Sequence, residues 1–419
     1  MKASQPARLS RTMSSKSTLL ITACLAGDLD AARELLDSGT CVDVTNSQKR
    51  TPLFAACRNG HVECVRLMIK AGALVDLAAH GGTTPLTAAC KRGHIECARL
   101  LIEAGAAVDL ALNNGMTPLY VACRMGSFEF ARLLLEGGAA VDQAANDGCT
   151  PLLTACYMGD VDCVRLMIEG GAEVDRKTDN GIMPLYVTCQ EGHVECTRLM
   201  IEGGAAVDVA ANNGGFTPLF IACQHGRVEC ARLLLEAGAS VDLAAEDGTT
   251  PLCIACHYGH LDSVRLLCSY SASRIATVDG IDGTAERLTE DCGYAELTAW
   301  LVRSRGWTPL HHLEELTYAR ARALLRDGAD PHAQPSPTPA TRAEAIDGEV
   351  SRLVLRAAQP WSRDSHELYP DAARARALEL LRLGQQLSVQ PRFTGEEQAV
   401  VDVWVMHVMP HVVGREGTA

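Results

Sequence analysis

The stretch "DGTTPLCIACHYGHLDSVRLL", residues 247–267, contains the signals for a turn and two short helices. Thr250 is a typical N-cap and Pro251 a typical first helical residue, because proline lacks the N–H that would have no partner there. Gly259 is the kind of residue that ends a helix, and the apolar residues from Leu261 onward give a second helix one buried face. Asp247-Gly248 favours a tight turn before both helices. The stretch therefore predicts the order turn, helix, turn, helix.

The same pattern recurs between residues 17 and 280. Thr-Pro-Leu or a close variant begins at 51, 84, 117, 150, 183, 217 and 250, and a glycine follows each proline by eight residues. An arginine ladder keeps the same step, at 33, 66, 99, 132, 165, 198, 232 and 265. The step is 33 residues, with one step of 34. A period of this length indicates a solenoid in which each unit packs on its neighbours.

This order of elements at this period resembles the ankyrin repeat, and residues 247–267 follow the family pattern nearly throughout. The resemblance implies an all-α fold, an ankyrin-repeat solenoid of helix-turn-helix repeats with short β-turn hairpins, followed by a small helical C-terminal region. The histidine usual after Thr-Pro-Leu is replaced in the regular repeats, by Phe54, Thr87, Tyr120, Leu153, Tyr186, Phe220 and Cys253.

The pattern divides the chain into five segments. Residues 1–16 are expected to be a disordered leader; because they lack acidic residues and contain Ser and Arg, an organelle transit peptide is the alternative. Residues 17–306 form the array, whose last unit (273–301) is a degenerate end repeat. Residues 307–334, with Thr-Pro-Leu-His, are a shortened ankyrin-like unit. Residues 335–342 are a linker by composition, and 343–419 a helical region with amphipathic helices over 371–383 and 396–413.

Composition limits the class of protein. The net charge of −13 argues against broad binding of nucleic acid or anionic membranes, and no apolar run reaches the roughly 20 residues of a membrane-spanning helix. Most of the eighteen cysteines recur on the repeat register, which is typical of small buried hydrophobes rather than of a disulfide framework. Reduced cysteines favour a cytoplasmic protein, with the nucleus as the alternative.

Three motifs suggest chemistry and are better explained by the repeats. Cys253-x-x-Cys256-His257 has the spelling of a c-type haem attachment site, but Cys256 belongs to the repeating cysteines. His61-x-Glu63 and its repeats match half of a zinc deaminase signature, and the Pro-Cys-x-x-Cys half is missing. Paired cysteines such as Cys57 and Cys64 fall on different helices and lack the four ligands of a zinc site. We therefore expect no cofactor, no metal and no enzymatic activity.

The resemblance places partner binding on the concave face, which the turn tips and first helices form. The variable residues there are basic in the N-terminal part and apolar or aromatic further on. The candidate partner-binding residues are Arg50, Arg58, Lys91, Arg92, Met116, Tyr120, Arg124, Met125, Tyr157, Met158, Tyr186, Phe220, His257 and Tyr258. The hypothesis is a protein or peptide ligand with an acidic segment over repeats two to four and an apolar segment after it. The alternative is that the aromatic residues pack between neighbouring first helices.

The expected function is that of a non-enzymatic protein-protein interaction module or scaffold. The second hypothesis comes from the tail, because a helical tail after an ankyrin array resembles the ankyrin-and-SOCS-box proteins. That resemblance implies a substrate-recognition adaptor that recruits a ubiquitin-ligase component through residues 343–419. The tail has no cysteine, although the ligase-binding box usually has one.

Overall fold

Short helices in antiparallel pairs make up most of the structure, a computed structural model that describes residues 5–212, 214–278, 281–359, 365–375 and 377–379. The chain divides into two units. Unit 1 comprises residues 1–222 and 229–239, and unit 2 comprises residues 223–228 and 240–419. The boundary passes through α13 (Pro218–Gln224) and α14 (Val228–Glu236).

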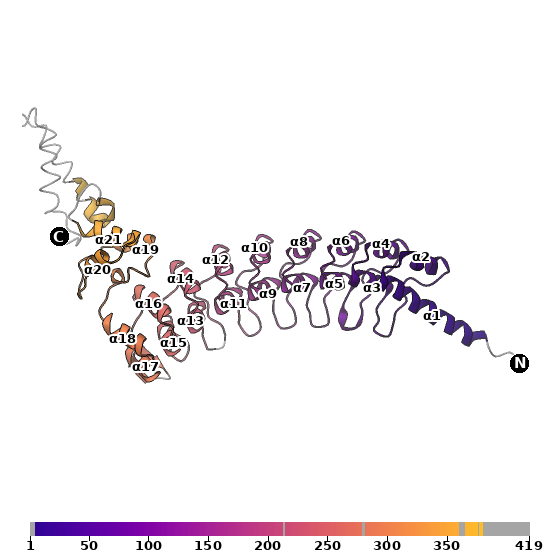
Figure 1. The fold of residues 1–419 in the computed structure, drawn as a ribbon, viewed down its shortest axis with the longest axis horizontal. Helices are drawn as coiled ribbons and strands as arrows, with labels where there is room; N and C mark the ends of the chain where they lie inside the picture. Colours follow the sequence, from indigo (N-terminus) through magenta and orange to yellow (C-terminus); the bar gives the residue numbers. More distant parts are fainter. Residues whose placement is uncertain (1–4, 213, 279–280, 360–364, 376, 380–419) are drawn as a thin grey trace, which may run out of the picture. The chain divides into compact units, whose positions relative to one another are not determined.

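Unit 1 repeats one helix pair. The first helices of the pairs lie in one row, the second helices in a parallel row, and the turns project beyond the first helices (Figure 1). The elements are α1 (Gln5–Ala26), α2 (Leu29–Asp37), α3 (Pro52–Asn59), α4 (Val62–Lys70), η1 (His80–Gly82), α5 (Pro85–Cys90), α6 (Ile95–Glu103), α7 (Pro118–Arg124), α8 (Phe128–Glu136), α9 (Pro151–Met158), α10 (Val161–Glu169), α11 (Pro184–Glu191) and α12 (Val194–Glu202).

The predicted helix starts are confirmed. Thr51 Oγ1 accepts a hydrogen bond from the N–H of Phe54 at 3.0 Å, and Pro52 is the first helical residue. Thr117 and Thr150 cap α7 and α9 in the same way. Met183, which stands where the others have threonine, provides no such cap to α11.

Hydrogen bonds join each repeat to the next. Asp109 accepts from the N–H of Ala140 with both carboxylate oxygens at 3.1 Å, and Asp142 and Asp175 bind the next repeats at the same separation of 31 residues. The Nε2 of His193 donates to the carbonyl of Tyr157 at 3.2 Å, since a carbonyl only accepts. Gly159 makes this contact possible, because a Cβ there would lie 2.6 Å from the His193 ring.

The repeating cysteines belong to the core, as predicted. Cys57, Cys90, Cys97 and Cys123 are at most 1% exposed, and all eighteen cysteines are free thiols. Burial raises the pKa of Cys90 to about 12 and that of Cys97 to about 11. These thiols therefore stay protonated at neutral pH and pack as apolar groups.

The N-terminal segment differs from the prediction. Residues 5–16, expected to be a disordered leader, are the first part of α1, which continues to Ala26. No glycine lies between Gln5 and Ala26, and Pro6 falls in the first turn, where proline is tolerated. The first helix of the first repeat therefore extends backward without interruption.

Unit 2 begins with the helix pair α15 (Pro251–His257) and α16 (Leu261–Ser269). The degenerate end repeat follows, and an antiparallel hairpin of β1 (Ile275–Val278) and β2 (Ile281–Thr284), with Ile275 opposite Thr284, takes the place of its turn. Its helices are α17 (Ala285–Asp291) and α18 (Ala295–Arg303). The remaining elements are η2 (Pro309–His311), α19 (Tyr318–Arg326), α20 (Pro339–Ala345), α21 (Glu349–Ala358) and η3 (His366–Leu368).

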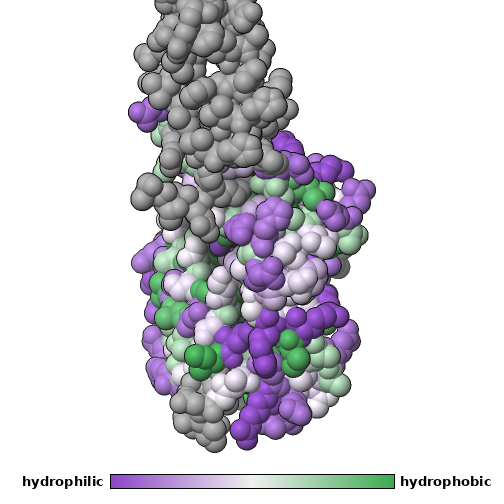
Figure 2. Space-filling view, turned by 90° about the vertical axis from the view of Figure 1, so that its left-hand side faces the viewer, coloured by the Kyte–Doolittle hydropathy of each residue, from purple (hydrophilic) through white to green (hydrophobic). Residues whose placement is uncertain are grey.

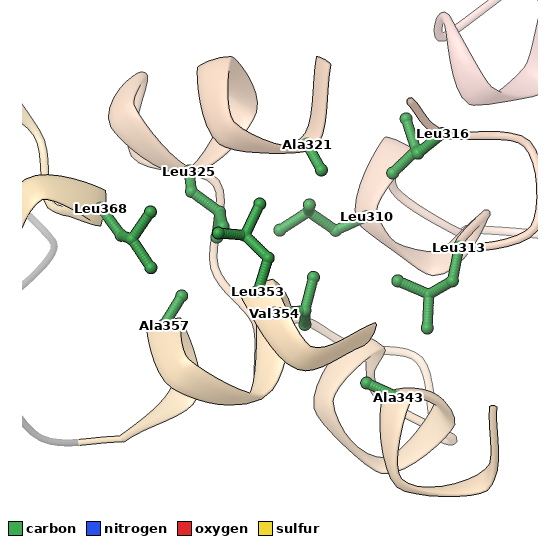
Figure 3. Packing of buried hydrophobic residues seen from close by; sticks show 10 residues of the cluster. All are labelled: Leu310, Leu313, Leu316, Ala321, Leu325, Ala343, Leu353, Val354, Ala357 and Leu368. Carbon is green, nitrogen blue, oxygen red and sulfur yellow. The ribbon is translucent and has the colours of Figure 1, made fainter. Parts of the chain in front are cut away.

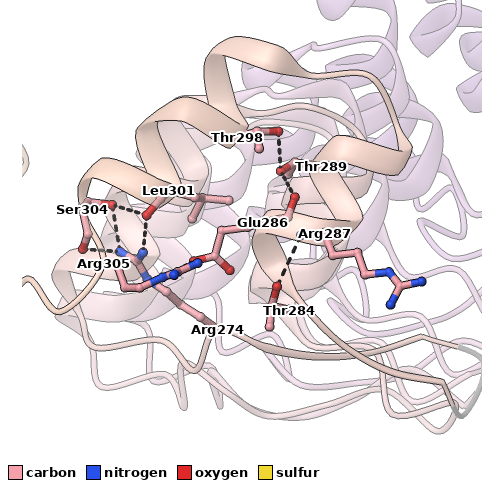
Figure 4. Close-up of polar contacts among 9 residues, drawn as sticks. All are labelled: Arg274, Thr284, Glu286, Arg287, Thr289, Thr298, Leu301, Ser304 and Arg305. Carbon is pink, nitrogen blue, oxygen red and sulfur yellow. Dashed lines mark hydrogen bonds and ion pairs between the residues drawn. The ribbon is translucent and has the colours of Figure 1, made fainter.

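Polar contacts hold the end repeat together (Figure 4). Arg274, just before the hairpin, donates hydrogen bonds to the carbonyls of Leu301 and Ser304 at 2.8 and 3.0 Å. These bonds give partners to carbonyl groups at the C-terminal end of α18, where the helix itself provides none. Arg305 forms an ion pair with Glu286 of α17 at 3.3 Å.

On the face of the molecule drawn in Figure 2, hydrophobic residues are scattered among hydrophilic ones.

The elements after α18 share one apolar core. Leu310 of η2, Leu325 of α19, Leu353 of α21 and Leu368 of η3 point toward one another (Figure 3). Each is at most 2% exposed, which is typical of side chains in a packed core. The shortened unit and the helices after it therefore fold as one body.

The linker prediction is wrong for residues 339–342. They begin α20, which Thr338 caps through the N–H of Thr341 and Pro339 opens. Thr338-Pro339 repeats the helix-start signal of unit 1, and α20 with α21 forms another helix pair. Residues 371–375 and 377–379 are helical, as predicted for 371–383; the predicted helix over 396–413 lies outside the described residues.

Candidate partner-binding surface

The last two positions before each glycine that ends a first helix form two rows of side chains in unit 1. We call these ten residues the first-helix surface. Row A is Arg58, Lys91, Arg124, Tyr157 and Gln190, and row B is Asn59, Arg92, Met125, Met158 and Glu191. Neighbouring first helices contact one another, so equivalent positions follow one another along the unit. All ten side chains are exposed or partly exposed.

The N-terminal part of this surface is cationic and is not neutralised by neighbouring carboxylates. None of Arg58, Lys91, Arg92 and Arg124, nor Arg50 on the adjoining turn, pairs with a carboxylate of the described residues. Burial, together with the charge of Arg124, lowers the pKa of Lys91. Burial and Arg58 lower the pKa of Arg50 in the same way. Positive charges on this surface therefore act on one another.

The arginine ladder of the second helices is different. Arg66 lies 3.7 Å from Glu63, Arg99 lies 3.5 Å from Glu96, and Arg198 lies 3.3 Å from Glu195. These pairs are three residues apart on one helix face, and each stabilises its helix by a few tenths of a kcal/mol. The cations of the first-helix surface have no such carboxylate partner among the described residues.

The middle of the surface is apolar. Met125, Tyr157 and Met158 are 55%, 56% and 50% exposed, although they are large apolar or aromatic side chains. Tyr157 is held at its carbonyl by His193. Aromatic residues, methionine and arginine are enriched at protein interfaces, and all three kinds lie side by side here.

Three predicted site residues do not reach this surface. Tyr120, Tyr186 and Phe220 are 7%, 8% and 2% exposed, so the alternative prediction, packing between neighbouring first helices, holds for them. Each lies three residues after the N-cap, on the side of its helix that packs within the stack. Met116 is partly buried and its sulfur lies 3.9 Å from Arg124 Nη1.

His257 and Tyr258 belong to unit 2 and are therefore not part of the first-helix surface of unit 1. Both are exposed; His257 Nδ1 lies 3.9 Å from Cys292 Sγ, and Gln224 Nε2 donates to the Tyr258 hydroxyl at 3.5 Å. Cys253 and Cys256 of the haem-like motif are buried. Among the described residues no three His, Cys, Asp or Glu side chains gather as a metal site requires.

No helix in the part of the chain that the structure describes has both the length and the apolar character needed to cross a membrane.

Comparison with known proteins shows what this arrangement is similar to. The family described as "Ankyrin repeats (3 copies)" matches residues 5–79, 74–145, 108–178 and 152–245, and the family described as "Ankyrin repeat" matches residues 247–279. The matches therefore span more than half of the chain. No curated protein matches the sequence.

Two solved structures are similar to part of the chain. The human ASB11 ankyrin repeat domain is 29% identical, with a TM-score of 0.48, over 53% of this chain and 98% of that one. The ankyrin repeat domain of Bcl-3, described as a unique member of the IkappaB protein family, is 26% identical, with a TM-score of 0.48, over 52% of this chain and 97% of that one. From the family matches and the repeated helix pairs, the chain belongs to the ankyrin-repeat family, whose domains are generally non-catalytic modules that bind other proteins.

Proposed function

We propose that this protein is a non-enzymatic interaction module that binds an acidic protein or peptide through the first-helix surface of unit 1. One observation carries the proposal: cations without carboxylate partners lie next to exposed Met125, Tyr157 and Met158. A ligand with acidic and apolar side chains complements both parts of this surface.

The two parts contribute in different ways. Unpaired cations attract an acidic partner from a distance and speed its association, an effect that salt screens. Burial of the half-exposed methionines and tyrosine contributes about 25 cal/mol per Å² of apolar surface removed from water, and the free-energy costs of association and side-chain ordering offset part of this gain. Carboxylates on the partner also relieve the repulsion between Lys91 and Arg124.

For its location, we propose a reducing compartment, with the cytoplasm first. Eighteen free thiols support this proposal, because disulfides form and persist in oxidising compartments.

The adaptor hypothesis receives no support from the described residues. Residues 339–358 of the supposed recruiting tail form α20 and α21, and Leu353 and Val354 are buried against the other elements of unit 2. Residues 380–419 of the tail lie outside the described residues, so recruitment through residues 343–419 stays a prediction.

The proposal is tested by capture from a cell lysate with the full-length chain and two triple variants of equal charge change. R58Q/K91Q/R124Q removes cations from the first-helix surface, and R66Q/R99Q/R132Q removes cations from the second helices. We expect acidic partners of the unmodified chain to be lost with the first variant and kept with the second, while circular dichroism shows both folded. Retention of the same partners by both variants would contradict the proposal.

A further inference from the structure

We infer that the first-helix surface recognises an extended polyproline II segment with an acidic residue at every third position, followed at the same spacing by a large apolar residue. This inference rests on the proposed function and adds to it a ligand conformation and a ligand pattern. The supporting argument is that the interval between neighbouring residues of row A matches the rise of one turn of a polyproline II helix.

Row A offers one side chain per repeat. Arg58, Lys91, Arg124 and Tyr157 are each the seventh residue counted from the proline that begins the first helix. The helices α3, α5, α7 and α9 contact one another in sequence. Packed helices lie roughly 8–10 Å apart, so three cations and then a tyrosine follow one another at about this interval.

A polyproline II helix has the matching period. It has 3 residues per turn and rises about 3.1 Å per residue, so side chains three positions apart point the same way at intervals of about 9 Å. A β-strand does not match, because its residues three positions apart point to opposite faces. An α-helix reaches the interval only at every seventh residue.

Row B agrees with this choice of conformation. Its residues follow those of row A by one position, which is about 100° around an α-helix, while successive side chains of polyproline II are about 120° apart. Because the ligand has three residues per turn, when one residue faces row A one of its two neighbours lies on the side of row B. Opposite Arg92 an acidic residue fits, and opposite Met125 and Met158 apolar residues fit.

Charge complementarity selects the ligand. Arg58, Lys91 and Arg124 have no carboxylate partner among the described residues, and the charge of Arg124 acts on Lys91. Acidic residues at the same spacing place one carboxylate at each cation instead of several at one. Tyr157 and Met158, both half exposed, then receive the apolar residue.

The test uses synthetic fluorescent peptides and the full-length chain, with affinity measured by fluorescence anisotropy. Each peptide has three glutamates and one phenylalanine, with proline and alanine between them, at spacings of two, three or four, in both chain directions. We expect the spacing-three peptide in one direction to bind about tenfold more tightly than isomers of the same composition. R58Q/K91Q/R124Q and Y157A/M158A should each weaken it, and R66Q/R99Q/R132Q should not.

Two results overturn the inference. Equal affinity at spacings of two, three and four would mean that the cations act as a diffuse field. Tighter binding of a helical peptide with glutamates seven residues apart would assign the surface to an α-helix. In either case the proposed function stands if R58Q/K91Q/R124Q still abolishes binding of the peptides. The proposed function itself fails if that variant captures the same partners from the lysate as the unmodified chain.

Discussion

The Nδ1 atom of His311 accepts a hydrogen bond from the backbone N–H of Thr308 at 2.9 Å, and Thr308 Oγ1 lies 2.9 Å from the same nitrogen. Nε2 of His311 donates to the carbonyl of Pro335 at 3.1 Å, because a carbonyl only accepts. One side chain thus caps η2 and ties it to the segment that leads into α20. The regular repeats lack this arrangement, because they have no histidine after Thr-Pro-Leu.

Replacing His311 by alanine is therefore expected to destabilise unit 2 by about 1–2 kcal/mol, since it removes a helix cap and a buried hydrogen bond. Urea unfolding followed by tryptophan fluorescence measures this, because Trp300 and Trp307 lie in unit 2 and no tryptophan precedes residue 300 in the sequence. His332→Ala is the control: His332 is exposed, and its side chain donates one hydrogen bond, to the carbonyl of Ala358. A loss no larger than that of the control would show that the cap contributes little.

The stability of unit 2 is expected to fall in acid because of His312. Burial, followed by the charges of Arg274, His311 and Arg342, lowers the pKa of His312 to about 3 from an ordinary value near 6.5. The unfolded chain binds the proton on this histidine more readily than the folded chain does. The contribution of neutral His312 to the free energy of unfolding is therefore complete above pH 6.5. It is lost as the pH falls toward 3, by at most about 1.4 kcal/mol per pH unit. Urea unfolding at pH 7, 6 and 5 should show that the unfolding free energy of His312→Phe depends less steeply on pH than that of the unmodified chain. Equal slopes would refute the assignment.

Two tyrosines of the first helices should respond differently to truncation. Tyr120→Ala empties a core position and should cost about 3 kcal/mol of unfolding free energy, whereas half-exposed Tyr157→Ala should cost little. Urea unfolding followed by circular dichroism compares them. Similar losses at both positions would mean that Tyr157 is packed rather than displayed.

Gly159 and Gly171 form a matched pair for testing the contact between repeats. Both have positive φ, 70° and 83°, but a Cβ at Gly159 would meet His193 while a Cβ at Gly171 would meet nothing within 4 Å. Gly171→Ala should cost about 1 kcal/mol from backbone strain, and Gly159→Ala at least about 1 kcal/mol more. Thermal unfolding should also show that adding His193→Ala recovers part of the second loss. Equal losses at the two glycines would argue against the clash.

The cysteines are expected to react with iodoacetamide according to their burial. Cys41 is exposed and should be alkylated in the native protein, while Cys57, Cys90 and Cys123 should react only after unfolding. Buried thiols with raised pKa present little thiolate to the reagent. Mass spectrometry of the native and urea-treated chain distinguishes the two classes. Native alkylation of Cys90 at the rate of Cys41 would contradict the prediction.

Helix starts and ends were predictable because they depend on local residues. Thr51, Pro52 and Gly60 act within one helix, so their spacing is visible in the sequence. Residues 339–342 were missed for the opposite reason: a single Thr338-Pro339 signal stands among several prolines, and only the core shared with Leu310 and Leu353 shows that it opens a helix.

The binding surface was only partly predictable. Tyr120 and Tyr157 are both tyrosines of a two-turn helix, and their burial depends on which side of the stack each faces. A signal was present in the repeats, because the position of Tyr120 is apolar, threonine or cysteine in every regular repeat, while that of Tyr157 varies in charge. The residue three positions earlier also distinguishes the arginines of the second helices from those of the first helices. Arg66 on a second helix has Glu63 at that position, so it can form an ion pair, whereas Arg58 on a first helix has Ala55 there.

The hydrogen bonds of Asp109 and His193 reach only the adjacent repeat, 31 and 36 residues away. Recombination that inserts or removes a whole unit therefore leaves every remaining unit with its partners. Each unit gained adds one residue to row A and one to row B, so a ligand of a new length or pattern can be accommodated without rebuilding the core. In this way the evolution of specificity is separated from the evolution of stability.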